Sequence, residues 1–187
     1  MGICLVIPAY NSAATIVNVV EETLASGFPL LVVDDGSTDG TAERLAGLPL
    51  EVRRHPLNRG KGAALRTGFS WALENGYSAV ITLDSDGQHD PTAILRLLTA
   101  AREGDFDILI ASRAGQFGEM AGLRNSWNRF GVWCVRKKTG FEITDSQSGF
   151  RYYSARILKN IELTADGYEL EMEVLMKAWR AGLTIGS

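Results

Sequence analysis

Short apolar runs alternate with longer amphipathic stretches over the first 112 residues of the chain. The apolar runs are rich in Val, Ile and Leu and almost continuous, which is typical of strands covered on both faces of a sheet. They predict strands at Ile3–Ile7, Leu30–Val33, Leu50–Arg53, Ala79–Leu83 and Asp107–Ala111. The stretches between them predict helices at Ala13–Ser26, Asp39–Ala46, Gly62–Glu74 and Pro91–Arg102. This alternation predicts the α/β class, with a Rossmann-like, mainly parallel sheet flanked by helices.

The alternation stops after Arg113. A glycine-rich stretch at residues 114–121 predicts a loop. Beyond it, the pattern predicts a helix near Leu123–Lys138, a strand at Ser148–Tyr153 and a helix at Tyr168–Ala181. We expect these elements to cover the open edge of the same sheet, so that residues 1–187 form a single domain. The last residues, Leu183–Ser187, have the pattern of a strand just starting, so we expect the natural protein to continue beyond them.

Composition narrows the class of protein. The chain has 187 residues, of which 45% are hydrophobic and 22% are charged, as in ordinary soluble domains. A net charge of −3 excludes an overall basic field, so no nucleic-acid partner is expected. No apolar run approaches the ~18–20 residues that cross a bilayer, and no signal peptide is recognisable. Cys4 and Cys134 define neither a disulfide framework nor a metal site, so the chain is expected to be cytoplasmic.

Polar side chains follow each of the first five predicted strands. In an open parallel sheet, ligands bind beyond the carboxyl ends of the strands. The segments at these ends are Pro8–Asn11, Asp34–Asp39, Asn58–Gly62, Asp84–Asp90 and Ser112–Arg113. We therefore expect their polar and charged groups to converge on one crevice.

The carboxylates of Asp84 and Asp86 are the sharpest signal of chemistry. They leave a buried strand two residues apart, so both can point to the same side of its tip. Hard oxygen ligands of this kind suit Mg²⁺ or Mn²⁺ shared with a phosphate, and Gln88 adds a neutral oxygen at the same spacing. The alternative is a solvated acidic turn before a helix. We favour the metal site, because two neighbouring carboxylates repel and a tight turn gains little from both.

Two further strand ends suggest binding groups. Asp34 or Asp35 can accept hydrogen bonds from a base N–H or from ribose hydroxyls, whereas Asp39 is expected to cap the following helix. The backbone and cations of Asn58–Gly62, Lys61 among them, favour an anion at a helix N-terminus. This segment is neither a Walker loop nor a dinucleotide fingerprint. The two histidines, His55 and His89, lack a partner at metal-ligand spacing and are interpreted as structural.

Taken together and in order, these motifs resemble a known family. Val6–Asn11, Val32–Thr41, Asn58–Gly62 and Asp84–Pro91 resemble the motifs of family 2 glycosyltransferases of the GT-A fold. Ser112–Arg113 and Gln147–Arg151 match the polyprenyl-phosphate glycosyltransferases of that family, the subgroup of the dolichyl-phosphate mannose synthases. The resemblance covers nearly the whole chain. One departure is Ser12, where these synthases often carry Glu.

The resemblance implies inverting sugar transfer from a GDP- or UDP-sugar to a polyprenyl (dolichyl or undecaprenyl) phosphate, with Mg²⁺ or Mn²⁺. It implies that residues 1–113 bind the nucleotide sugar and residues 114–187 lie on the acceptor side. Asp84, Asp86 and Gln88 would hold the metal. Arg113 would assist catalysis at the phosphates. The expected substrate-binding residues are Pro8, Tyr10, Asn11, Asp34, Asp35, Lys61, Asp84, Arg124 and Arg151.

The acceptor decides what catalysis requires. A lipid phosphate is largely anionic at neutral pH, because the second pKa of phosphomonoesters is about 6, and it needs cations rather than a base. A saccharide hydroxyl would need a carboxylate base, for which Asp145 is the candidate if it is not simply a turn residue. A family 2 transferase with a saccharide acceptor therefore remains the alternative. A sugar-nucleotide nucleotidyltransferase would need a glycine-rich loop after the first strand, which this chain does not have. A non-catalytic nucleotide-sugar binder is a third possibility, but it would not need Asp84 and Asp86.

The composition of the segment Arg124–Lys138 indicates where in the cell the protein acts. It carries five cations, no acid and an aromatic stripe at helical spacing, which suits the headgroup region of a membrane. The alternative is a surface helix that packs its stripe on the sheet. We expect peripheral association with a membrane. In the last predicted helix, Glu169, Glu171 and Glu173 are two residues apart and are expected to be mostly solvated.

Overall fold

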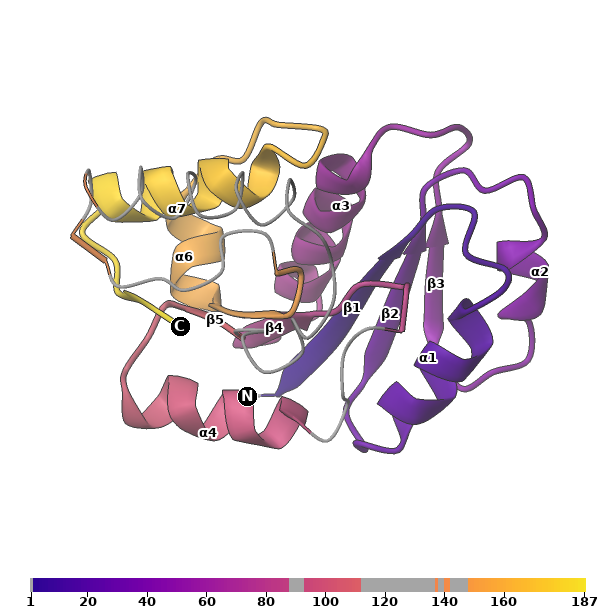
Figure 1. The fold of residues 1–187 in the computed structure, drawn as a ribbon, viewed down its shortest axis with the longest axis horizontal. Coiled ribbons are helices and arrows are strands. Elements are labelled where there is room, and N and C mark those ends of the chain that lie inside the picture. Colours follow the sequence, from indigo (N-terminus) through magenta and orange to yellow (C-terminus); the bar gives the residue numbers. More distant parts are fainter. Residues whose placement is uncertain (1, 88–92, 112–136, 138–139, 142–147) are drawn as a thin grey trace, which may run out of the picture.

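The computed structural model describes residues 2–87, 93–111, 137, 140–141 and 148–187. A seven-stranded sheet with the order β3-β2-β1-β4-β6-β5-β7 forms its centre (Figure 1). The strands are β1 Ile3–Ala9, β2 Leu30–Asp34, β3 Glu51–Arg54, β4 Ala79–Thr82, β5 Ile108–Ile110, β6 Arg151–Ser154 and β7 Ile185–Gly186. The helices are α1 Ile16–Leu24, α2 Thr41–Arg44, α3 Lys61–Glu74, α4 Ala93–Glu103, α6 Ala155–Asn160 and α7 Leu170–Arg180. The prediction of an α/β fold is confirmed.

The sheet is mainly parallel, as predicted. β1 pairs in parallel with β2 and β4, β2 with β3, and β5 with β7. Within the described chain, β6 alone runs antiparallel to its neighbours, β4 and β5. The second part of the chain was expected to cover the open edge of the sheet. It does so at β4 through β6, which also lies inside the sheet because β5 pairs with its other side. The strand expected near the C-terminus is present as β7, next to β5.

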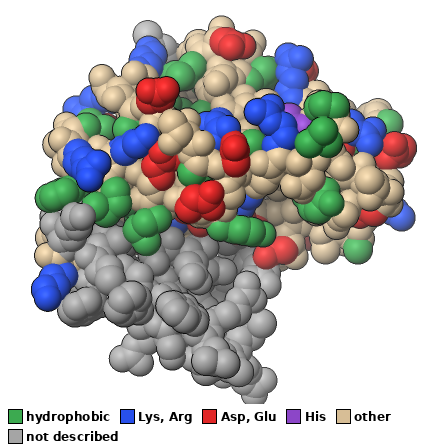
Figure 2. Space-filling model, turned by 90° about the horizontal axis from the view of Figure 1, so that it is seen from above, with side chains coloured by type: hydrophobic (Ala, Val, Ile, Leu, Met, Phe, Trp, Pro, Cys, Tyr) green, Lys and Arg blue, Asp and Glu red, His purple; other side chains and the backbone are tan. Residues whose placement is uncertain are grey.

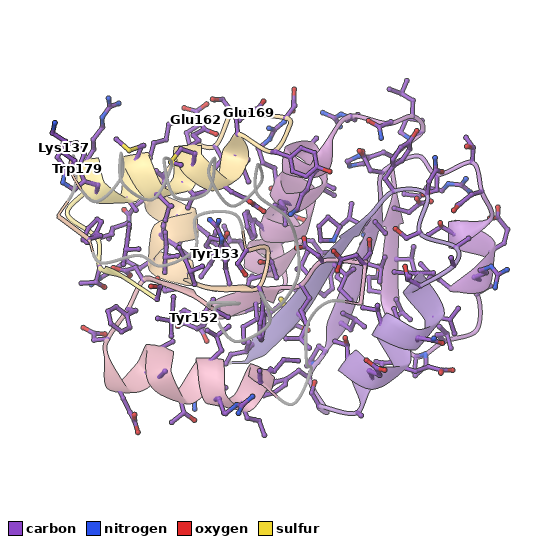
Figure 3. The ribbon with its side chains drawn as sticks, viewed as in Figure 1. Lys137, Tyr152, Tyr153, Glu162, Glu169 and Trp179 are labelled. Atoms are coloured by element: carbon purple, nitrogen blue, oxygen red, sulfur yellow. The ribbon has the colours of Figure 1, made fainter. Side chains whose placement is uncertain are left out.

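Helices cover both faces of the sheet. On one face, α3, α6 and α7 pack against alternate strand residues such as Cys4 and Val6. On the other face, α1 and α4 pack against the residues between them, Leu5 and Ile7. Tyr153 and Tyr152 show the same alternation in β6, since their side chains lie on opposite sides of the sheet (Figure 3). Two-sided burial explains why β1 and β5 are apolar at every position, whereas the edge strand β3 is largely exposed and carries Glu51, Arg53 and Arg54.

Two elements begin later in the structure than the sequence predicts, because polar side chains before them bond to other parts of the chain. α1 begins at Ile16 rather than Ala13, since the Ala13 N–H donates to Asp39 in the loop after β2 and the Thr15 hydroxyl donates to the Ser85 carbonyl after β4. β5 begins after Asp107, whose buried carboxylate accepts hydrogen bonds from Ser154, Arg156 and the Thr184 backbone. The predicted helix near Leu123–Lys138 lies almost wholly outside the described residues. No helix in the described part of the chain is long and apolar enough to cross a membrane.

Candidate active site

The loops that follow β1, β2 and β4 are bound to one another at the carboxyl edge of the sheet. The Asn11 backbone N–H donates to Ser37 Oγ at 2.9 Å, and Asn11 Oδ1 accepts from the Thr38 N–H at 2.9 Å. Asn11 is left-handed, with φ 49°, a conformation that Asn tolerates better than most residues. Ser12 Oγ lies 2.8 Å from Ser85 Oγ, which joins the first loop to the fourth strand. These three strand ends thus converge, as the sequence predicted.

Asp35 fastens a further strand end to this edge. Its carboxylate is buried and accepts from the backbone N–H groups of Arg59, at 3.0 Å, and Gly60, at 2.7 Å. His55 Nδ1 lies 2.6 Å from Asp35 Oδ1, and His55 Nε2 lies 2.9 Å from Thr67 Oγ1. The histidine therefore connects the β2 loop to α3, which agrees with its interpretation as structural.

Asp34 shapes the turn after β2. Its side chain is fully buried, and Oδ1 accepts from the Ser37 N–H at 3.0 Å. Oδ2 lies 3.1 Å from Arg54 Nε in an ion pair. Asp39, which was expected to cap α2, lies one residue before the N-cap, Gly40. It accepts from the Thr41 hydroxyl and N–H, which hold its pKa below the usual value.

Lys61 lies between two carboxylates at the centre of the site. Its Nζ is 2.7 Å from Asp84 Oδ1 and 2.7 Å from Glu171 Oε1, and 5.6 Å from the centre of the Tyr168 ring. Burial alone would lower the pKa of this amine, but Glu171 and Asp84 raise it above its ordinary value, so Lys61 stays charged. The expectation that Glu171 is solvated is wrong, because it faces inward from the first turn of α7.

Glu171 also binds Arg151, which is completely buried. Arg151 Nη1 donates to the Glu171 carbonyl at 3.1 Å, Nη2 lies 3.6 Å from its Oε2, and Nε donates to the Ser148 carbonyl at 2.6 Å. Asp84, Lys61, Glu171 and Arg151 thus form a chain of alternating charges. We call these four residues the charge chain. It joins the tip of β4 to α3, α7 and β6.

Glycines allow the backbone to approach these groups. A Cβ on Gly149 would lie 2.2–2.4 Å from the Asp84 carboxyl, so only glycine leaves room for that carboxylate. Gly60, with φ 96°, and Gly62 face the backbone of residues 165–167 in the same way. The Asp166 carbonyl accepts from the Ala63 N–H at 3.1 Å, so this loop covers the N-terminal end of α3. Figure 2 shows acidic and basic side chains intermixed over this side of the molecule.

A family model described as glycosyl transferase family 2 matches residues 4–161. The chain belongs to this family. It is therefore a glycosyltransferase, and the GT-A fold expected from its motifs is confirmed by the solved structures that it resembles. An undecaprenyl-phosphate mannosyltransferase of Micrococcus luteus is 33% identical over 199 residues, covering 99% of this chain and 81% of that protein.

Two other similar proteins differ in sugar or acceptor. A UDP-N-acetylglucosamine–dolichyl-phosphate N-acetylglucosaminyltransferase of Methanococcus voltae is 31% identical over 207 residues, covering 98% of this chain and 82% of that protein. Glucosyl-3-phosphoglycerate synthase of Mycobacterium tuberculosis, in its crystal structure with Mn²⁺, UDP and phosphoglyceric acid, superposes with a TM-score of 0.75 and 25% identity. That superposition covers 99% of this chain and 67% of that structure.

The predicted site residues of the glycosyltransferase fall into three groups. Pro8 and Tyr10 lie at the end of β1, where Tyr10 is 48% exposed, and Asp86 is exposed beyond the tip of β4. Asn11, Asp34, Asp35, Lys61, Asp84 and Arg151 lie at the same edge and hold its loops through the contacts above. Gln88, Arg113, Arg124 and Asp145 lie outside the described residues.

Metal binding would depend on Asp84 and Asp86. The described residues contain no cluster of three or more His, Cys, Asp or Glu side chains able to hold a metal. Mg²⁺ sites that use substrate phosphates, however, need only one or two protein carboxylates. Two carboxylates at one strand tip fit that requirement, and the Lys61 contact to Asp84 Oδ1 fixes the orientation of the first.

Sequence analysis missed Glu171 and the loop at residues 165–167. The spacing of the three glutamates in α7 does not show which one faces inward. The glycines at positions 60 and 62 were the available signal, because glycine next to a charged helix start often marks a close approach of another backbone. That approach brings α7, and Glu171 with it, to Lys61.

Glu171→Gln should destabilise the glycosyltransferase by about 3 kcal/mol, because removing one partner leaves Lys61 and Arg151 buried with too little negative charge. Glu162→Gln is the matched control, since Glu162 is exposed beside α7 (Figure 3). Urea unfolding followed by circular dichroism measures both variants. A loss no larger than the ~0.5 kcal/mol of an ordinary surface substitution would show that the charge chain does not stabilise the fold.

Proposed function

We propose that this glycosyltransferase moves a sugar, with inversion, from a nucleotide-sugar donor to a polyprenyl phosphate. The observation that supports it most is that relatives covering nearly the whole chain are named for undecaprenyl phosphate and dolichyl phosphate, although their sugars differ. A shared acceptor with variable sugars is expected if the acceptor chemistry is the common feature of the group. The motif Gln147–Arg151 supports the same acceptor.

In this proposal the donor binds at the carboxyl edge. Tyr10 and Asp35 would frame the base and ribose with Pro8, and they are neighbours, because the Asp35 N–H donates to the Ala9 carbonyl at 2.8 Å. Asn11 and Asp34 shape the two loops that carry them. Arg113 and Arg124 would bind the diphosphate. A UDP-sugar or a GDP-sugar is compatible with these roles, and the solved relative with UDP favours testing UDP-sugars first.

A divalent metal, Mg²⁺ or Mn²⁺, would be held by Asp84, Asp86 and Gln88. When bound, it would act as a Lewis acid that neutralises charge on the departing nucleoside diphosphate. The charge chain orients Asp84, since Lys61 Nζ lies 2.7 Å from one of its carboxylate oxygens. The structural relative with Mn²⁺ and UDP supports a metal of this class.

The acceptor determines the remaining roles. A polyprenyl phosphate attacks as an anion, so the protein must bind and orient it with cations such as Arg113 and Arg124. Lys61 and Arg151 would act indirectly, by holding Asp84 and the Ser148–Arg151 backbone in place. If the acceptor is instead a saccharide, Asp145 would have to serve as the base.

Access to such an acceptor requires a membrane surface, and we propose peripheral association through Arg124–Lys138. Its described member, Lys137, is exposed. A variant with Arg136→Glu, Lys137→Glu and Lys138→Glu should sediment less with anionic liposomes than the wild type, because each cation contributes about 1 kcal/mol near anionic lipid. Equal sedimentation of the two proteins would remove this segment as the membrane contact.

Asp86→Asn should abolish the enhancement of nucleotide binding by Mn²⁺ and lower the transfer rate about 100-fold, because it removes a charged ligand from a hard-cation site. Calorimetric titration of UDP and GDP, with and without Mn²⁺, gives the first readout. The control is Asp105→Asn, at the opposite edge of the sheet, where the positive φ of 47° suits Asn. If both variants retain the enhancement, Asp86 is not a metal ligand.

Labelled sugar should pass into an organic-extractable product when polyprenyl phosphate is supplied, and the free polyprenol should be inactive. The rate should rise with pH as the acceptor loses its second proton, near pH about 6. Radiolabelled UDP- and GDP-sugars assayed against polyprenyl phosphate, polyprenol and soluble saccharides measure this. Product formed only with saccharides would favour the alternative acceptor and a role for Asp145.

A further inference from the structure

We call the candidate active site at the carboxyl ends of the strands the strand-end site. A second polar concavity lies away from it, between the edge strand β3 and the helix α3. Its volume is about 470 Å³, within the range of small-molecule sites. Arginines line it from three elements: Arg53 from β3, Arg59 from the loop that follows, and Arg66 from α3. Thr67, Ser70 and Trp71 complete the helix side. The proposed roles in sugar transfer use none of these six residues.

The charges of this pocket are only partly compensated. Arg66 binds Asp166 and the Ala165 carbonyl. Arg53 lies 3.1 Å from Glu51, but both side chains are about half exposed, so that ion pair is weak. Within the described chain, no ion pair is recorded for the Arg59 side chain, which is exposed. The single acid of the lining, Glu74, is eight residues beyond Arg66, about 12 Å along the helix.

We propose that this pocket binds a phosphate group. Guanidinium groups bind phosphate through paired N–H donors, and here three arginines line one hollow together with Ser70. A carboxylate ligand would use fewer of these donors, because it has only two oxygens. The phosphate can belong to a phospholipid headgroup or be free in solution, since both present the same oxygens.

The pocket is separate from the strand-end site, but it shares a residue with the hydrogen bonds that hold Asp35 in that site. Thr67 lines the pocket, and its hydroxyl lies 2.9 Å from His55 Nε2, while His55 Nδ1 lies 2.6 Å from Asp35. A ligand in the pocket would therefore rest on the side chains that hold Asp35. The proposal does not depend on the sugar acceptor, and its test needs no transfer activity.

Calorimetric titration with inorganic phosphate in chloride buffer tests the pocket. The double variant Arg53→Gln with Arg59→Gln should weaken phosphate binding at least about tenfold, because it removes two charged hydrogen-bond donors. Arg44→Gln, an exposed arginine on α2, should bind as the wild type does. Saturation of the strand-end site with UDP and Mn²⁺ should leave phosphate binding unchanged.

A second pair of variants keeps all three arginines. Ser70→Glu places a carboxylate in the pocket at an exposed helix position and should abolish phosphate binding, whereas Ser70→Gln should preserve it within about twofold. Flotation with phosphatidylcholine vesicles, with and without phosphatidylglycerol, distinguishes the sources. Loss of phosphatidylglycerol-dependent flotation in Ser70→Glu but not in Ser70→Gln assigns the site to a lipid headgroup, and unchanged flotation assigns it to free phosphate. Equal phosphate affinity in all variants, or displacement of phosphate by UDP and Mn²⁺, would overturn the proposal.

Discussion

The position of Lys61 between Asp84 and Glu171 is the constraint on which the site depends. An ammonium largely withdrawn from water requires negative partners, and two carboxylates from distant parts of the chain supply them at 2.7 Å each. Glu171 in turn balances the fully buried Arg151. The four charges sum to zero, so the network can be buried only when all members are present. The tip of β4, the start of α3, the start of α7 and the start of β6 are therefore positioned together.

The rest of the edge is organised by backbone contacts that glycine permits. Gly149 admits the Asp84 carboxylate, while Gly60 and Gly62 admit the loop at residues 165–167. Asn11 and Asp34, which the sequence predicted to bind substrate, accept hydrogen bonds from backbone N–H groups of the loop after β2. The loops are thus held before any donor arrives, which lowers the entropy lost on binding. Tyr10 and Asp86, in contrast, are exposed at this edge.

Local patterns predicted most of the fold, because a strand buried on both faces is recognisable from its own residues. The buried strands β1, β2, β4 and β5 were found in this way, and the ends of β1 to β4 converge as expected, whereas Ser112–Arg113 lie outside the described residues. The insertion of β6 between β4 and β5 was not found, since pairing between residues about seventy positions apart leaves no local pattern. Glu171 was misjudged for the same reason: its burial is decided by Lys61 and Arg151, not by its place in α7. The motifs indicated the family, but they did not show which residues hold the site residues in place, as Glu171 holds Lys61 and Arg151.

The position of β6 inside the sheet affects how the chain can fold during translation. β5 pairs only with β6 and β7 in the described sheet, and both are synthesised after residue 150. During translation the first 110 residues can assemble β1 to β4, but β5 has no neighbour until the residues of β6 and β7 have left the ribosome. Asp84 likewise lacks Gly149 beside it until then. Residues 1–113 and 114–187 are thus not separate units of folding, and the edge of β4 is exposed to other nascent chains until β6 has been synthesised.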